Sequence, residues 1–157
     1  IYKFPVHGPA WLTRTNLAGD GQADLKHHGG PDQAVLAYSV EAYAYWEREY
    51  PDLDWSYGAF GENFTISGLR DDTVCVDDIY QIGEVLVQAS RPRTPCWKLA
   101  RRLGIKDAVS AVWETGWAGW YFRVLQEGPV EAGLPVTLIE RSTARNMVEA
   151  NQENRPA

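Results

Sequence analysis

Apolar and polar residues alternate along several short segments of the chain, which is the period-two pattern of half-buried strands. The segments 84–89 and 120–125 show this alternation most clearly. Strands are predicted at 1–4, 10–13, 33–38, 79–82, 84–89, 120–125 and 136–139. Glycine, proline and turn-forming dipeptides separate nearly all of them, so the strands are short and closely spaced.

A different periodicity appears after Ser39, which is a suitable N-cap for a helix that extends to about Tyr50. Tyr43, Trp46 and Tyr50 recur at helical spacing, and Pro51 ends the pattern. An aromatic stripe of this kind is typical of core packing rather than of a cofactor site.

Two further helices are predicted in the middle of the chain. Thr94 is the expected N-cap of the first, with Pro95 at its first position and Gly104 just past its end. The second opens at Asp107 and stops at Gly116. Many short strands with a few helices predict a mainly β domain with flanking helices, an α+β fold of β-barrel type.

The chain has 157 residues, which suits one domain, expected at 1–150 with a polar tail at 151–157. Its net charge of −6 gives no electrostatic reason to bind nucleic acid or an anionic membrane. The segment 91–106 nevertheless holds six of the fifteen basic residues and no acidic one. A local basic patch on an acidic protein favours a small anionic ligand.

The two cysteines are too few for a disulfide framework, which indicates a reducing compartment. No apolar run approaches the roughly 20 residues of a membrane helix. We therefore expect a cytoplasmic protein without a membrane partner.

Cys96 is the more interesting of the two cysteines. With Thr94 as cap, its sulfur would lie where free main-chain N–H groups and the helix dipole favour a thiolate. The basic residues of the helix itself lie on the other face, so Arg91 and Arg93, in the preceding loop, are the better candidates to contact an anionic group. The alternative is that Cys96 is simply a small buried apolar residue, as we expect of Cys75.

Two loops carry further polar candidates. DLKHHGGPDQAV places His28 before a rigid Gly-Gly-Pro turn, although adjacent histidines without ligands at the usual spacing are a weak metal site. GAFGENFTISGL places Glu62 and Asn63 directly after Gly61, where a glycine allows a ligand close to the backbone or makes an ordinary turn. The residues alone leave both readings open.

Three blocks in order, GDGQADLKHHGGPDQAVLAYS, GAFGENFTISGL and VDDIYQIGEVLVQASRPRTPCWKLARRLG, resemble the MOSC domain family, in its stand-alone bacterial YiiM-like branch. The resemblance implies a compact β-barrel domain that binds the molybdenum cofactor (molybdopterin). By position in the PRTPC block, Cys96 would be the metal ligand. Arg91 or Arg93 would bind the cofactor's phosphate, and the resemblance also implies pocket positions for His28, Glu62 and Asn63.

The resemblance further implies an oxidoreductase that reduces N-hydroxylated compounds, such as 6-N-hydroxylaminopurine and amidoximes, with Cys96 and His28 as catalytic residues. Electrons would come from a separate reductase, and relatives suggest a homodimer. Two alternatives stay open. One is a non-catalytic module that binds or carries the cofactor or sulfur. The other is a metal-free thiol enzyme that uses Cys96 with His28 as base.

Overall fold

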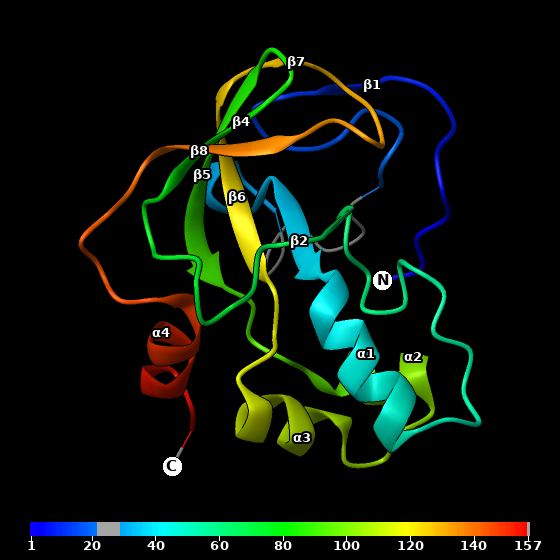
Figure 1. Cartoon of the computed structure of the whole chain (residues 1–157). Helices are drawn as coiled ribbons and strands as arrows, with labels where there is room; N and C mark the ends of the chain where they lie inside the picture. The colour runs from blue at the N-terminus through cyan, green and yellow to red at the C-terminus, as the bar shows by residue number, and fades with distance from the viewer. Residues whose placement is uncertain (22–28, 157) are drawn as a thin grey trace.

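The structure is a computed structural model that describes residues 1–21 and 29–156. A curled sheet forms its body, with α1, α2 and α3 gathered at one end and the small β1–β7 ribbon at the other (Figure 1). The strands are β1 (Ala10–Leu12), β2 (Val35–Ser39), β3 (Phe64–Ile66), β4 (Ile79–Ile82), β5 (Val85–Pro92), β6 (Trp120–Gln126), β7 (Gly128–Val130) and β8 (Val136–Glu140). The helices are the short 3-10 helix η1 (Pro31–Gln33) and the α-helices α1 (Val40–Glu49), α2 (Trp97–Leu103), α3 (Ala108–Thr115) and α4 (Met147–Glu153).

The main sheet has the strand order β3-β2-β6-β5-β4-β8, and within the described residues β3 and β8 are its edges. All of its neighbours pair antiparallel except β2 and β3, which are parallel. The sheet is thus a curled half-barrel, and the predicted α+β class with flanking helices is confirmed.

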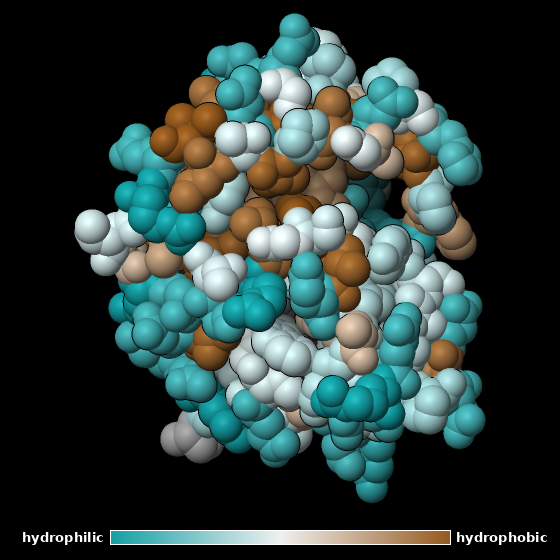
Figure 2. Space-filling model, in the orientation of Figure 1, coloured by the Kyte–Doolittle hydropathy of each residue, from teal (hydrophilic) through white to brown (hydrophobic). Residues whose placement is uncertain are grey.

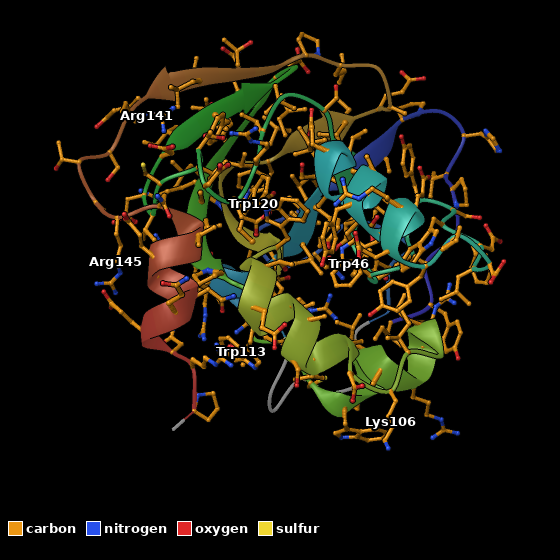
Figure 3. All side chains as sticks on the ribbon, turned by 60° about the horizontal axis from the view of Figure 1, so that its bottom comes forward. Trp46, Lys106, Trp113, Trp120, Arg141 and Arg145 are labelled. Atoms are coloured by element: carbon orange, nitrogen blue, oxygen red, sulfur yellow. The ribbon has the colours of Figure 1, made fainter. Side chains whose placement is uncertain are left out.

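The alternation seen in the sequence separates the two faces of β5 and β6. Val85, Val87 and Ala89 of β5 are fully buried, as are Trp120 and Phe122 of β6. These residues form the main core inside the curl, and Figure 3 shows Trp120 in the interior. The intervening residues of both strands therefore lie on the opposite face, where the candidate site is found.

A second, aromatic core joins α1 to the sheet. Ser39 caps α1 as expected, since its hydroxyl accepts from the N–H of Glu41 at 3.2 Å. Trp46 is fully buried and donates through Nε1 to the Tyr38 hydroxyl at 2.8 Å. Phe60 stacks on Tyr38 with ring centroids 4.1 Å apart. The aromatic stripe of α1 is therefore core packing, as predicted (Figure 3).

Three local expectations need correction. The segment 1–4 is not a strand, because no neighbouring strand pairs with it. Thr94 is not the cap of α2: pairing with β6 keeps the chain extended to Pro92, and Cys96, itself extended, is the N-cap. The segment 151–157, expected to be a polar tail, begins inside α4, where Asn151 is buried. Gly104 and Gly116 do end their helices in the left-handed conformation, as predicted.

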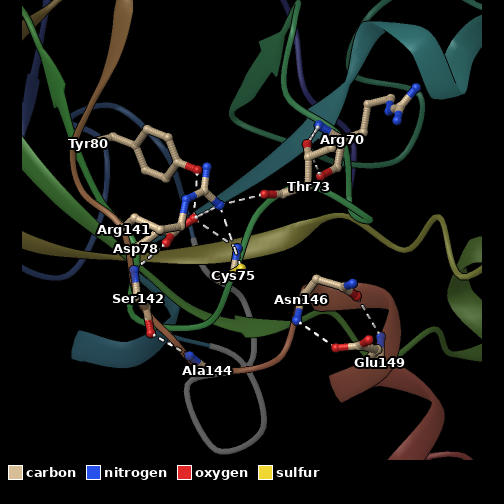
Figure 4. Close-up of polar contacts among 10 residues, drawn as sticks. All are labelled: Arg70, Thr73, Cys75, Asp78, Tyr80, Arg141, Ser142, Ala144, Asn146 and Glu149. Carbon is tan, nitrogen blue, oxygen red and sulfur yellow. Dashed lines mark hydrogen bonds and ion pairs between the residues drawn. The ribbon is translucent and has the colours of Figure 1, made fainter.

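The chain between β8 and α4 is anchored by a buried carboxylate (Figure 4). Asp78 is fully buried, and its Oδ1 accepts from the main-chain N–H of Ser142 at 2.8 Å. Its Oδ2 accepts from Cys75 N at 2.9 Å, the Tyr80 hydroxyl at 3.0 Å and Arg141 Nη1 at 2.9 Å. Cys75 thus lies in a structural junction that joins β4 to the C-terminal segment.

The surface differs between the two ends of the sheet. Figure 2 shows hydrophobic side chains over the upper half of one face, where β8 exposes Leu138 and Ile139, and mostly polar residues lower down, over the helices. No helix in the described part of the chain is long and apolar enough to cross a membrane.

Candidate functional site

Cys96 lies just beyond the end of β5, at the first turn of α2. The strand pairing holds this segment in place, because the N–H of Arg93 donates to the carbonyl of Gly119, at the start of β6, at 2.9 Å. The Cys96 side chain is half-buried and belongs to neither core cluster. Its sulfur has no hydrogen-bond partner among the described residues. Within the described residues, the thiol is therefore neither engaged in a hydrogen bond nor packed in a core cluster.

Arg93 carries a buried positive charge. It is 7% exposed, and its Nη1 donates to the carbonyl oxygen of Phe60 at 2.6 Å. No carboxylate in the described part of the chain pairs with it. Burying a charge is costly unless a partner compensates it, so this guanidinium favours an anion at its remaining N–H groups.

Tyr121, which the sequence analysis did not select, lies opposite Arg91 in the β5–β6 pairing. Among the described residues, Arg93, Arg91 and Cys96 act electrostatically on its phenol. Burial raises the pKa of Tyr121 and outweighs the two arginines, which lower it, so the phenol is neutral at physiological pH. The alternation of Trp120 and Phe122 was the available signal, because it turns Tyr121 to the other face.

The GGPD turn is docked against the same two strands. Gly29 and Gly30 have φ values of 106° and 88°, which residues with a side chain rarely adopt. The Ser90 hydroxyl donates to the carbonyl oxygen of Asp32 at 2.6 Å, and Arg123 Nε contacts the Asp32 carboxylate at 2.7 Å. The turn therefore ends beside Arg91 and Tyr121. His28, the predicted pocket residue in this block, lies outside the described residues.

The Glu62 carboxylate is hydrogen-bonded mainly within and around its own turn. Its carboxylate accepts hydrogen bonds from the Tyr43 hydroxyl at 2.5 Å, Gly58 N at 2.8 Å, Phe60 N at 3.2 Å and the Thr65 hydroxyl at 3.0 Å. It is 3% exposed. The carboxylate raises the pKa of Tyr43 further, beyond the larger effect of burial. The structure thus gives Glu62 a supporting position, holding the turn whose Phe60 carbonyl binds Arg93.

Asn63 connects β2 to the start of the first sequence block. Its Oδ1 accepts from Leu36 N at 3.0 Å, and its own N–H donates to the Leu36 carbonyl at 2.8 Å. Its Nδ2 donates to Asp20 at 2.7 Å. Asn63 therefore connects Asp20 to Leu36 of β2, and no hydrogen bond within the described residues connects it to Cys96.

The three sequence blocks converge at this end of the sheet. The donor set is a free thiol at Cys96, a buried guanidinium at Arg93, an exposed one at Arg91 and the phenol of Tyr121. In the described residues, no three His, Cys, Asp or Glu side chains gather as a metal site. Among the described residues of this end of the sheet, the candidate metal ligand is the Cys96 thiol. The arrangement fits a soft metal with an anionic tail.

Comparison with known proteins identifies the family. The model of the MOSC domain matches residues 24–137, which is most of the chain. The chain belongs to the MOSC domain family. YflK of Bacillus subtilis is 48% identical over 141 residues, 90% of this chain, and YiiM of Escherichia coli is 41% identical over 152 residues, 96% of it. The chain spans 63% of the length of YflK and 68% of that of YiiM.

Solved MOSC structures share the fold. YiiM of Escherichia coli superimposes on the whole chain and 77% of its own with a TM-score of 0.86 and 36% identity. YiiM of Geobacillus stearothermophilus gives a TM-score of 0.83 and 41% identity over 96% of this chain and 70% of its own. A fungal protein from Gibberella moniliformis, named a reductase, is 39% identical over 90% of this chain, which spans 26% of that protein. Members of the family are associated with the molybdenum cofactor.

Proposed function

We propose that the chain binds the molybdenum cofactor at Cys96 and reduces N-hydroxylated compounds, such as 6-N-hydroxylaminopurine and amidoximes, with electrons from a separate reductase. The observation that carries the proposal concerns two neighbouring groups: within the described residues, the Cys96 thiol has no hydrogen-bond partner and the buried cation of Arg93 has no carboxylate partner. Membership of the MOSC domain family and the fungal relative named a reductase support it.

The chain's own residues would bind and orient the cofactor. The Cys96 thiolate would be its protein ligand, and metal binding keeps a thiol deprotonated. Arg93, and Arg91 at the surface, would bind its phosphate, since guanidinium groups match phosphate geometry. When bound, the cofactor supplies the two-electron chemistry that cleaves an N–O bond.

The other signature residues would act from further away. Glu62 fixes the turn 58–62, and through the carbonyl of Phe60 it sets the direction of the Arg93 side chain. Asn63 holds Asp20 beside β2 through its hydrogen bonds to Asp20 and Leu36. The protein's share of the reaction is thus a rigid cationic cradle that leaves Cys96 accessible.

The test is cofactor loading in three proteins produced in a host that makes the cofactor: wild type, Cys96→Ala and Cys75→Ala. Cys75→Ala is the matched control, since it removes the other free thiol. We expect near-stoichiometric molybdenum and pterin in wild type and in Cys75→Ala. Cys96→Ala should lose both, while its circular dichroism spectrum stays unchanged. Equal molybdenum in all three proteins, or none in any, would contradict the proposal.

Turnover is the second part of the test. Loaded wild-type protein, supplied with a reduced flavin- or haem-containing electron donor, should convert 6-N-hydroxylaminopurine to adenine and benzamidoxime to benzamidine. Full loading without turnover by several donors would instead identify a module that carries or binds the cofactor.

A further inference from the structure

We propose that Tyr121 is a further ligand-binding residue of this site, and that its phenol O–H donates a hydrogen bond to an oxyanion held between Arg91 and Arg93. The inference rests on the proposed function, in which that oxyanion is the phosphate end of the cofactor. It goes beyond it in naming a donor that the MOSC signature blocks do not contain.

The first argument is position. Tyr121 and Arg91 are direct partners in the antiparallel β5–β6 pairing, so their side chains leave the same face of the sheet about 5 Å apart at Cβ. A register shift between Ala89 and Arg91 interrupts the ladder at this point. Such irregularities redirect side chains and are common beside functional sites.

The backbone at this irregularity is fixed by a side chain. The Ser90 hydroxyl donates its one proton to the carbonyl oxygen of Asp32 at 2.6 Å and lies 3.1 Å from the carbonyl oxygen of Tyr121, which can share it. The phenol is therefore carried on a rigid segment, braced from both β6 and η1. Pre-organisation of this kind lowers the entropic cost of binding a ligand.

The second argument is the hydroxyl itself. The buried phenols of Tyr38, Tyr43 and Tyr80 each donate a hydrogen bond, to Trp117 O, to Glu62 and to Asp78 respectively. Partly buried Tyr121 donates none within the described residues, although phenols removed from water usually find a partner. Its hydroxyl is thus available to a ligand.

The third argument is the charge around the phenol. Two guanidinium groups are near it, and an oxyanion attracted to them would lie within reach of the hydroxyl. Because burial keeps the phenol protonated, it offers a proton to such an oxygen rather than competing with it for the cations. The three groups would then supply donors from two strands and the following segment.

The experiment uses metal-free protein and inorganic pyrophosphate as the probe, with affinity measured by calorimetry. Tyr121→Phe should bind pyrophosphate about tenfold more weakly than wild type, the loss expected for one hydrogen bond to a charged acceptor. Tyr57→Phe removes an exposed phenol elsewhere and should bind like wild type. Arg93→Ala should lose more than Tyr121→Phe, since it removes a charge.

The melting temperature distinguishes a structural role of the Tyr121 hydroxyl from a ligand-binding role. Without pyrophosphate, Tyr121→Phe should melt with wild type, because its hydroxyl makes no hydrogen bond within the described fold. With saturating pyrophosphate, wild type should be stabilised more than the variant. Equal affinity of the two proteins for pyrophosphate, no binding by wild type, or a lower melting temperature of the ligand-free variant would each overturn the inference.

The experiment distinguishes a failure of this inference from a failure of the proposed function. If Tyr121→Phe weakens pyrophosphate binding while wild type never takes up molybdenum, the oxyanion site stands and the proposed function falls. If molybdenum loading depends on Cys96 while wild type and Tyr121→Phe bind pyrophosphate equally, only the role of Tyr121 falls.

Discussion

Replacing Asp71 by asparagine should abolish most of the loss of stability that the wild-type protein undergoes between about pH 5 and pH 8. Asp71 is 1% exposed, its Oδ1 accepts from Gly119 N at 2.8 Å, and its Oδ2 has no partner among the described residues. Burial raises the pKa of this carboxyl from 3.8 to about 7, although the N–H of Gly119 acts in the opposite direction. At pH values between 3.8 and about 7, the folded protein therefore keeps a proton on Asp71 that the unfolded chain releases.

The sign and size of the effect follow from this difference. Because the pKa is higher in the folded state, the stabilising contribution is complete below the unfolded value of 3.8 and is lost as pH rises through about 7. Each pH unit between these values costs about 1.4 kcal/mol of unfolding free energy. Between about pH 5 and pH 8, wild type should thus lose about 3 kcal/mol relative to Asp71→Asn, which has no charge to bury.

Urea denaturation followed by tryptophan fluorescence across this pH range measures the difference directly. Asp52→Asn is the matched control, since Asp52 is an exposed carboxylate away from Asp71, and its variant should keep the pH slope of wild type. If Asp71→Asn also keeps that slope, the carboxylate is already ionised in the fold and the argument from burial is wrong.

Three further substitutions test the supports of the site and the fold by urea denaturation. Tyr43→Phe removes the 2.5 Å hydrogen bond to buried Glu62 and should cost about 2–4 kcal/mol; a loss below about 0.5 kcal/mol would show that Glu62 does not depend on it. Gly119→Ala should cost at least about 2 kcal/mol, because φ is 77° and the added Cβ would lie 2.5 Å from a main-chain oxygen of β2. Arg141→Gln removes one hydrogen-bond donor from buried Asp78, which keeps three others, and should cost about 1–2 kcal/mol of unfolding free energy. Arg145→Gln is the control, because it removes only an exposed ion pair with Glu153 and should leave stability unchanged.

Local signals in the sequence predicted most helix ends and most strands. Ser39 as a cap, and Gly104 and Gly116 as left-handed stops, act through their own backbone and nearest neighbours, so a single sequence reveals them. The start of α2 was misplaced because β6, which is distant in sequence, holds Arg91 and Pro92 in a strand. Pairing partners of this kind are not encoded in the local pattern.

The candidate site likewise combines residues that the local sequence reveals with one that only the strand pairing reveals. Cys96, Arg91 and Arg93 stand close together in the chain, and the sequence selected all three. Tyr121 joins them only through the register of β6 against β5, which a one-residue slip would reverse. Its place in the site therefore becomes visible only when the sheet is known.

The contacts of Arg93 show how Glu62 can support the site through the backbone. Two main-chain oxygens hold this arginine: Phe60 O binds its guanidinium and Gly119 O binds its N–H. Each of these residues is fixed in turn by a buried carboxylate, since Glu62 accepts from Phe60 N and Asp71 accepts from Gly119 N. A change at either carboxylate should thus reach the site through a displacement of Arg93, with Cys96 chemically intact. Substitutions at Glu62 should accordingly weaken anion binding and stability together, whereas Tyr121→Phe should weaken anion binding alone.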